Sequence, residues 1–324
     1  WVKQLKIALQ GASYSMENAV VKSHFSMISP EGQSQVTIPK MTLLVGGGDD
    51  AAIMTATDFK MSNNFHKIGS IVYGKRQLSA GVISVQQGDH KVAIKQANLD
   101  TQVTPFVGTT DIALQWSIGS YKADKKGSGP LRFSLTLSKM NTEALDYFLK
   151  QALSDQGGYS SVQPQRLVLP LMKVLSHGVE ADVKLNYNTG LGPLAVTGSW
   201  VIPESGTSNP FKVIQTMTAD VDASAPTLWV QHVLEWSVSR AAALQHQPIV
   251  GRVPAVQQAQ LALKQLVSNK MLIVKDDVLS LKATFQDGGL LVNGAVPDFS
   301  ALKKASSTTT SPNKAKQTNT SSSA

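Results

Sequence analysis

PLRFSLTLSKM, residues 130–140, opens the stretch that decides the fold. Leu131, Phe133, Leu135 and Leu137 alternate with polar residues, a pattern that predicts a strand with one apolar and one polar face. NTEALDYFLKQALSD (141–155), PQRLVLPLMKVLSHG (164–178) and VEADVKLNYNTGLGPLAVTGSWVIP (179–203) follow it. The order strand, helix, helix, hairpin predicts an α+β fold, because helices and antiparallel strands occupy separate blocks of the chain.

The first of these helices carries a full set of sequence signals. Asn141 can act as its N-cap, and Glu143 lies in the first turn, where the helix dipole favours an acid. Its apolar residues recur at helical spacing: Leu145, Phe148, Leu149, Ala152 and Leu153. The second helix is expected from Pro164 to Ser176, kinked or broken at Pro170, and the hairpin turns at residues 188–192.

Towards the N-terminus, residues 1–129 are predicted to form a series of strands, since apolar residues recur at period two between turn residues. One strand changes phase internally: Val36 and Ile38 alternate in one register, while Met41 and Leu43 continue in the opposite one. Pro39 lies between them and cannot donate to a ladder, so a bulge or an edge position is expected there.

Towards the C-terminus we expect a strand over Phe211–Val221, a helix from Ser224–Pro226 to about Gln245, a helix from Pro254 to Ser268 and a strand over residues 278–286. The predicted architecture is a large, twisted, mainly antiparallel sheet with about four helices in the C-terminal two thirds. We divide the chain into a strand-rich region (1–129), a continuous α+β region (130–297) and a tail (298–324). The Ser/Thr/Lys-rich tail is predicted to be disordered.

Composition narrows the function classes. The chain has 324 residues, is 42% hydrophobic and contains no cysteine, which excludes disulfides and thiolate metal sites. No apolar run approaches the roughly 20 residues needed to cross a bilayer. The net charge of +8 includes four tail lysines, and no basic–aromatic pattern suggests nucleic-acid binding. The start at Trp1 is compatible with removal of an N-terminal targeting or anchoring segment.

No catalytic, cofactor or metal site is expected from motifs. The six histidines are scattered without metal-ligand spacing, and no nucleophile elbow, Walker lysine or zinc-protease motif occurs. Trp229, His232 and Trp236 share one side of a predicted helix and, with Trp200 and Trp116, form the candidate ligand or partner patch. The alternative is that tryptophans simply cover a sheet edge.

The combination of Leu145–Asp146 in the first helix, Gly192 to Trp200 in the hairpin and LLVNG at residues 290–294 resembles the YdgA-like family of bacterial envelope proteins of unknown function. The resemblance covers residues 131–297. It implies a periplasmic body attached to the inner membrane by a segment outside this chain, and a possible homodimer. It brings no catalytic residues.

Three functions remain open from the sequence. The first is a non-catalytic envelope protein that binds a lipid, another hydrophobic ligand or an envelope partner on an apolar sheet surface. The alternative is a structural or assembly module that acts as a homodimer. The third is a hydrolase whose serine or carboxylate is brought beside a histidine by the fold.

Overall fold

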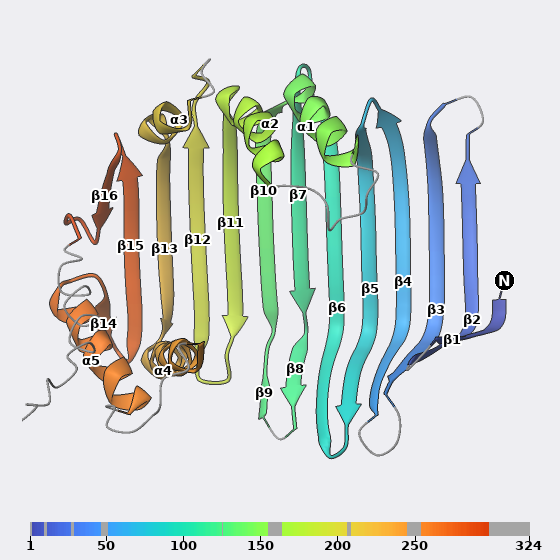
Figure 1. Cartoon of the computed structure of the whole chain (residues 1–324), viewed down its shortest axis with the longest axis horizontal. Helices are drawn as coiled ribbons and strands as arrows, with labels where there is room; N and C mark the ends of the chain where they lie inside the picture. Colours follow the sequence, from blue (N-terminus) through green and yellow to red (C-terminus); the bar gives the residue numbers. More distant parts are fainter. Residues whose placement is uncertain are drawn as a thin grey trace, which may run out of the picture.

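A computed structural model describes residues 2–9, 12–26, 29–46, 51–124, 126–154, 164–205, 209–244 and 254–297. In these residues one sheet of sixteen strands runs through the whole molecule (Figure 1), and every pairing in it is antiparallel. The strand order is β1-β2-β3-β4-β5-β6-β7-β10-β11-β12-β13-β15-β14, with β16 beside β15, and with β8 pairing β6 and β9.

The strands are β1 (Val2–Leu9), β2 (Ala12–Phe25), β3 (Glu31–Val45), β4 (Ala52–Ile68), β5 (Ile71–Gln87), β6 (His90–Pro105), β7 (Thr109–Ile118), β8 (Ser120–Ala123), β9 (Lys126–Ser128), β10 (Leu131–Asn141), β11 (Val179–Asn188), β12 (Pro193–Ile202), β13 (Thr218–Pro226), β14 (Ile273–Lys275), β15 (Val278–Gln286) and β16 (Gly289–Val292). The helices are α1 (Thr142–Ser154), α2 (Pro164–Ser176), α3 (Pro210–Thr216), α4 (Thr227–Leu244) and α5 (Ala255–Ser268).

A line of backbone kinks crosses the N-terminal half of the sheet. Asn18 in β2, Asp58 in β4 and Gln96 in β6 have positive φ, and the ladder pairs skip these residues and their neighbours. On β3 the skipped residue is Pro39, where the phase change was predicted, and on β5 it is Gly81. The apolar residues of these five strands change between even and odd positions at this line, as Val36 and Ile38 give way to Met41 and Leu43 on β3. We infer that the alternation of side chains reverses at the kinks, which keeps the apolar residues on one face.

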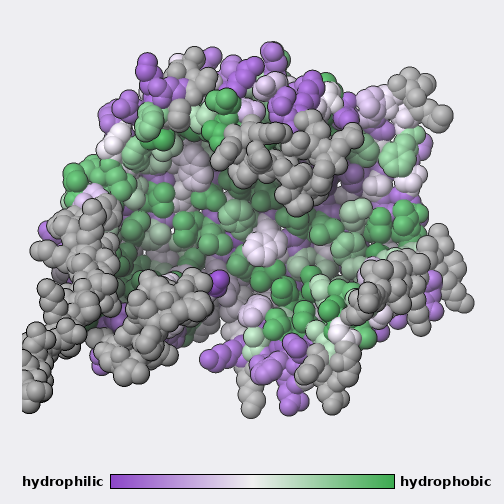
Figure 2. Space-filling model, in the orientation of Figure 1, coloured by the Kyte–Doolittle hydropathy of each residue, from purple (hydrophilic) through white to green (hydrophobic). Residues whose placement is uncertain are grey.

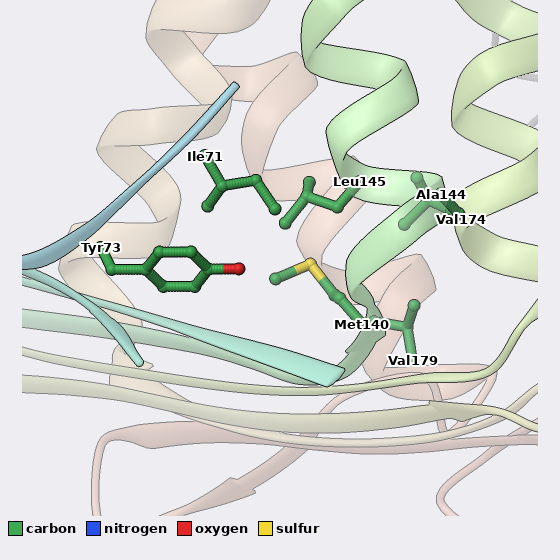
Figure 3. Close-up of a cluster of buried hydrophobic side chains, with 7 residues drawn as sticks. All are labelled: Ile71, Tyr73, Met140, Ala144, Leu145, Val174 and Val179. Carbon is green, nitrogen blue, oxygen red and sulfur yellow. The ribbon is translucent and has the colours of Figure 1, made fainter. Parts of the chain in front are cut away.

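Helices α1 and α2 lie along one margin of this apolar face (Figure 1). Their buried residues meet the ends of β5, β10 and β11 in one cluster (Figure 3), formed by Ile71, Tyr73, Met140, Ala144, Leu145, Val174 and Val179. α3 joins the same margin through Val213, which packs with Met172 of α2 and Ile202 of β12. The N-cap of α1 is as predicted, since the Ala144 backbone N–H donates to Asn141 Oδ1 at 2.9 Å.

Helices α4 and α5 lie against each other at the opposite margin, next to β13 and β15 (Figure 1). Thr227, the first residue of α4, donates from both its backbone N–H and its hydroxyl to the Asp277 carbonyl, at 2.8 and 2.9 Å. Ala259 of α5 and Leu279 of β15 are buried here. The helices therefore cover the two margins of the apolar face at its C-terminal half.

The predicted fold class is confirmed, with five helices in the described residues rather than four. Two predictions were wrong. Residues 211–216 form helix α3 instead of the start of a strand, and β13 begins at Thr218. Residues 224–226, expected to open a helix, are the end of β13, and α4 begins at Thr227. The Phe211 backbone N–H donates to the Asn209 side chain at 3.0 Å, and Pro210 follows this cap. β7 pairs with β10, so the sheet continues across residues 129 and 130. The predicted disordered tail (298–324) lies outside the described residues.

Candidate ligand-binding face

An unbroken cross-strand row of apolar residues runs along the helix-bearing face of the sheet from β2 to β15. Each member is the direct ladder partner of the next, and we call the set row 1: Val21, Val36, Met61, Leu78, Leu99, Trp116, Phe133, Leu185, Val196, Ala223 and Leu281. Ten inter-strand steps of about 4.8 Å make row 1 about 48 Å long.

Every row 1 residue has a polar neighbour in the sequence that points to the opposite face, and these neighbours all lie on the same side of row 1. They are also direct ladder partners: Lys22, Gln35, Ser62, Gln77, Asp100, Gln115, Ser134, Lys184, Thr197, Asp222 and Lys282. The neighbours on the other side of row 1 are mostly polar but include Val20 and Ala195. One side of the sheet is therefore made to face water. The other side carries the apolar surface that a two-layer domain would cover.

No member of row 1 is buried, although all of them are described. Trp116, at the centre of the row, is 42% exposed, and Val21 is 55% exposed. Figure 2 shows the resulting apolar band between the margins of this face. Monomeric soluble proteins rarely expose a contiguous apolar surface of more than a few hundred Å² unless it binds something.

Two further rows lie beside row 1 on the same face. Row 2 is polar over β2–β6 and apolar beyond: Ser23, Ser34, Asn63, Arg76, Thr101, Leu114, Leu135, Val183, Gly198, Val221 and Ala283. Row 3 is again free of polar side chains: Phe25, Gly32, Phe65, Gly74, Val103, Ile112, Leu137, Ala181, Trp200, Ala219 and Phe285. A small polar island is thus enclosed by apolar rows.

The residues of the predicted aromatic patch fall into two groups. Trp116 and Trp200 lie on the apolar face, in rows 1 and 3, and the Trp200 ring reaches over Gly198, where an added Cβ would lie 3.3 Å from it. The other three residues lie on α4. Trp236 is 60% exposed with the Arg240 guanidinium 5.2 Å from its ring centre, His232 is exposed and Trp229 is half-buried.

The polar residues of row 2 were missed by the sequence reasoning. Arg76 stands in the segment KRQLS, residues 75–79, between Lys75 and Gln77, so it appears there as part of an ordinary polar run. The signal that could have found it is its spacing from Leu78, which puts the two residues on the same face of a strand.

Among the described residues, His90 forms an ion pair with Asp124. His90 Nδ1 is 3.2 Å from Asp124 Oδ2, and both residues are exposed: His90 is the first residue of β6 and Asp124 lies in the turn after β8. The Lys91 backbone N–H, which donates to Asp124, and the neighbouring His90 ring hold the pKa of Asp124 below its usual value. Within the described residues no group of three or more His, Asp or Glu side chains could hold a metal ion.

Helix α1 also forms hydrogen bonds to the β4–β5 and β6–β7 turns beside the apolar face. Asp146 accepts hydrogen bonds from the Ser70 backbone N–H at 2.5 Å and from Lys150 Nζ at 2.6 Å, and these two donors, Lys150 first, hold its pKa below the usual value. A Cβ at Gly69 would lie 2.6 Å from Asp146 Oδ1. The Thr142 backbone N–H donates to the Gly108 carbonyl at 3.1 Å, which ties the β6–β7 turn to the same helix.

A family profile described as a bacterial protein of unknown function (DUF945) matches residues 2–297. The chain belongs to this DUF945 family. No curated protein and no solved structure matches the chain. The segments that suggested a family from sequence have structural roles in this DUF945 fold. Leu145 is a buried residue through which α1 packs on the sheet, and Asn293 accepts from the Lys282 backbone N–H and donates to the Lys270 and Met271 carbonyls. No helix among the described residues is long and apolar enough to span a membrane.

Proposed function

We propose that this DUF945 protein is a non-catalytic bacterial envelope protein that binds lipid on the apolar face of its sheet. The observation that supports the proposal is row 1: eleven direct ladder partners, all apolar and none buried. A lipid acyl chain spans about 15 Å, half the hydrocarbon core of a bilayer, so a row about 48 Å long offers room for several chains.

The energetics favour an apolar occupant. Each Leu, Phe or Met side chain that passes from half-exposed to covered gains on the order of 1 kcal/mol, at about 25 cal/mol per Å² of apolar area removed from water. Several such side chains from neighbouring strands contribute together. The helices at the two margins leave the middle of the face open, as Figure 2 shows, so an occupant can reach it from the front.

The test is native mass spectrometry of protein purified from bacterial envelopes, followed by lipid extraction. Trp116→Glu places a charge in the middle of row 1, and we expect it to lower retained lipid at least tenfold, because an acyl chain cannot solvate a carboxylate. Gln115→Glu is the matched control, since it adds the same charge on the polar face of the same strand. Wild-type protein without lipid, or equal retention in both variants, would contradict the proposal.

The second candidate is an assembly module that acts as a homodimer, and the edges of the sheet favour it. At one end the short strands β14 and β16 cover the outer edge of β15. At the other end β1 pairs only with β2 among the described residues, so its outer edge remains open. Sedimentation that finds a dimer free of lipid would favour this function over the first.

The location and the narrower family are also proposals. The resemblance to YdgA-like proteins supports a periplasmic body held at the inner membrane by a segment outside this chain. Fractionation of cells that produce the tagged full-length protein tests the location. Recovery of the protein in the cytoplasmic fraction would contradict it.

A further inference from the structure

Arg76 is the only charged residue in rows 1 and 2, which together cover the centre of the apolar face. It is exposed and forms no salt bridge with any described residue. The charged residues that lie between rows 1 and 2 along the strands belong to the polar row on the opposite face: Lys22, Asp100, Lys184, Asp222 and Lys282. Within these two rows of described residues Arg76 is therefore a single cation without an ion pair, and this needs an explanation.

The immediate neighbours of Arg76 are polar and uncharged. Asn63 on β4 and Thr101 on β6 are its direct ladder partners, and Ser34 and Ser23 continue the row to β2. Asn63 Oδ1 is buried and has no hydrogen-bond partner among the described residues. We call these five residues the polar island. Apolar residues border it on both sides, with Leu78 in row 1 and Phe65 in row 3 beside its centre.

The position of the island restricts what can cover the face. A purely apolar ligand that lay across β4–β6 would remove the Arg76 guanidinium from water without a partner, at a large cost in free energy. A ligand that brings an anion to Arg76 avoids this cost. The guanidinium presents a planar fork of donors that matches the oxygens of a phosphate or a carboxylate.

We propose that Arg76 and the polar island bind the anionic headgroup of an amphiphile whose hydrocarbon chain lies over β7, β10 and β11. This inference rests on the proposed lipid-binding function and adds the class of ligand and its direction. Row 2 changes from polar to apolar between Thr101 and Leu114, which are ladder partners. A chain that leaves the headgroup at Arg76 towards β7 therefore meets an apolar surface in all three rows.

Dodecyl phosphate below its micellar concentration is the probe, with dodecyl maltoside and inorganic phosphate as the two comparisons, and binding is measured by isothermal titration calorimetry. We expect the wild-type protein to bind dodecyl phosphate at least tenfold more tightly than dodecyl maltoside, since a charge-assisted hydrogen bond contributes about tenfold or more. Inorganic phosphate alone is expected not to bind, because the chain supplies the apolar contact.

Arg76→Gln is expected to remove the preference for dodecyl phosphate and to leave dodecyl maltoside binding unchanged. Arg76→Lys keeps the charge without the fork and should give an intermediate affinity. Lys75→Gln removes the same charge from the opposite face and should change neither affinity. Circular dichroism checks that the exposed substitutions leave the fold intact.

The failures of the two proposals are distinguishable. If dodecyl maltoside and dodecyl phosphate bind equally to the wild type, or if Lys75→Gln weakens phosphate binding as much as Arg76→Gln does, the headgroup site is wrong and lipid binding stands. If inorganic phosphate binds as well as dodecyl phosphate, the island is a simple anion site and the inference also fails. If no dodecyl amphiphile binds at all, both proposals are overturned.

Discussion

The line of kinks keeps the apolar residues on one face, and the pair Asp58 and Gly81 allows a direct test of it. A Cβ added at Gly81 would lie 2.8 Å from Asp58 Oδ2 and 3.1 Å from Asp58 Cβ. The carboxylate oxygen can rotate away, but the Cβ is held by the backbone, which has a φ of 53° at Asp58. Gly81→Ala should therefore force a shift of β4 or β5 at the kink.

The change in the free energy of unfolding caused by Gly81→Ala is the sum of two opposing effects. Crowding of this kind costs about 1–3 kcal/mol, while replacing glycine by alanine lowers the entropy of the unfolded chain and returns about 0.4–1 kcal/mol. We expect Gly81→Ala to destabilise the wild type by about 1 kcal/mol. In an Asp58→Gly background the obstructing atoms are gone, so the same substitution should be neutral or stabilising by about 0.5 kcal/mol.

The assay is urea unfolding of the four proteins of this double-mutant cycle, followed by far-ultraviolet circular dichroism. A coupling free energy of about 1 kcal/mol or more is expected between the two positions. Gly127→Ala is the control, because its added Cβ would meet only the Tyr121 carbonyl oxygen at an ordinary 3.5 Å. If Gly81→Ala has the same effect with and without Asp58, the two residues do not form the kink together and the reasoning fails.

Two further predictions concern helix α1. Leu145 is 6% exposed, and Leu145→Ala should lower the free energy of unfolding by about 2–4 kcal/mol. Leu169 on α2 is 72% exposed, and Leu169→Ala should change it by less than about 0.5 kcal/mol. Equal losses for the two variants in urea titrations would contradict the assignment of the core. Asp146→Asn should cost about 1 kcal/mol or less at pH 7, since the ion pair with Lys150 is partly exposed. Because the pKa of Asp146 is lowered in the folded state, the wild-type advantage should be complete above the unfolded pKa of about 4 and disappear as the pH falls through the folded value. An advantage that does not decrease as the pH falls below about 4 would refute that role for Asp146.

The phase of the strands could be predicted only in part from the sequence. Pro39 marks the kink in β3 because proline cannot donate to a ladder. The corresponding positions on β2, β4 and β6 are Asn18, Asp58 and Gln96, which adopt positive φ without being glycine. Asparagine and aspartate tolerate that conformation in many turns, and glutamine seldom does. Local preference therefore could not show that one line of kinks joins these strands.

The sequence contains a start signal for helix α3, but the strand-like apolar pattern of the following residues outweighs it. Residues 211–221 contain enough apolar residues for a strand, and the helix has only seven residues, too few to display a helical period. The sequence Asn209–Pro210 nevertheless has the form of an N-cap followed by proline at the first helical position. Packing of Val213 against Met172 and Ile202 then favours the helix, and this contact cannot be read from local sequence.

The candidate site illustrates a more general limit of alternation. Alternation in β10 predicts that Phe133 and Leu135 share an apolar face, and this is what the sheet shows. The same pattern arises whether that face is covered by the chain's own helices or by a ligand, because both remove the same side chains from water. Only the three-dimensional arrangement reveals that the described helices reach the margins alone and leave row 1 half-exposed. The unpaired Arg76 beside this row then becomes informative, since a cover supplied by the protein could include its own carboxylate, whereas a cover supplied from outside must bring the anion with it.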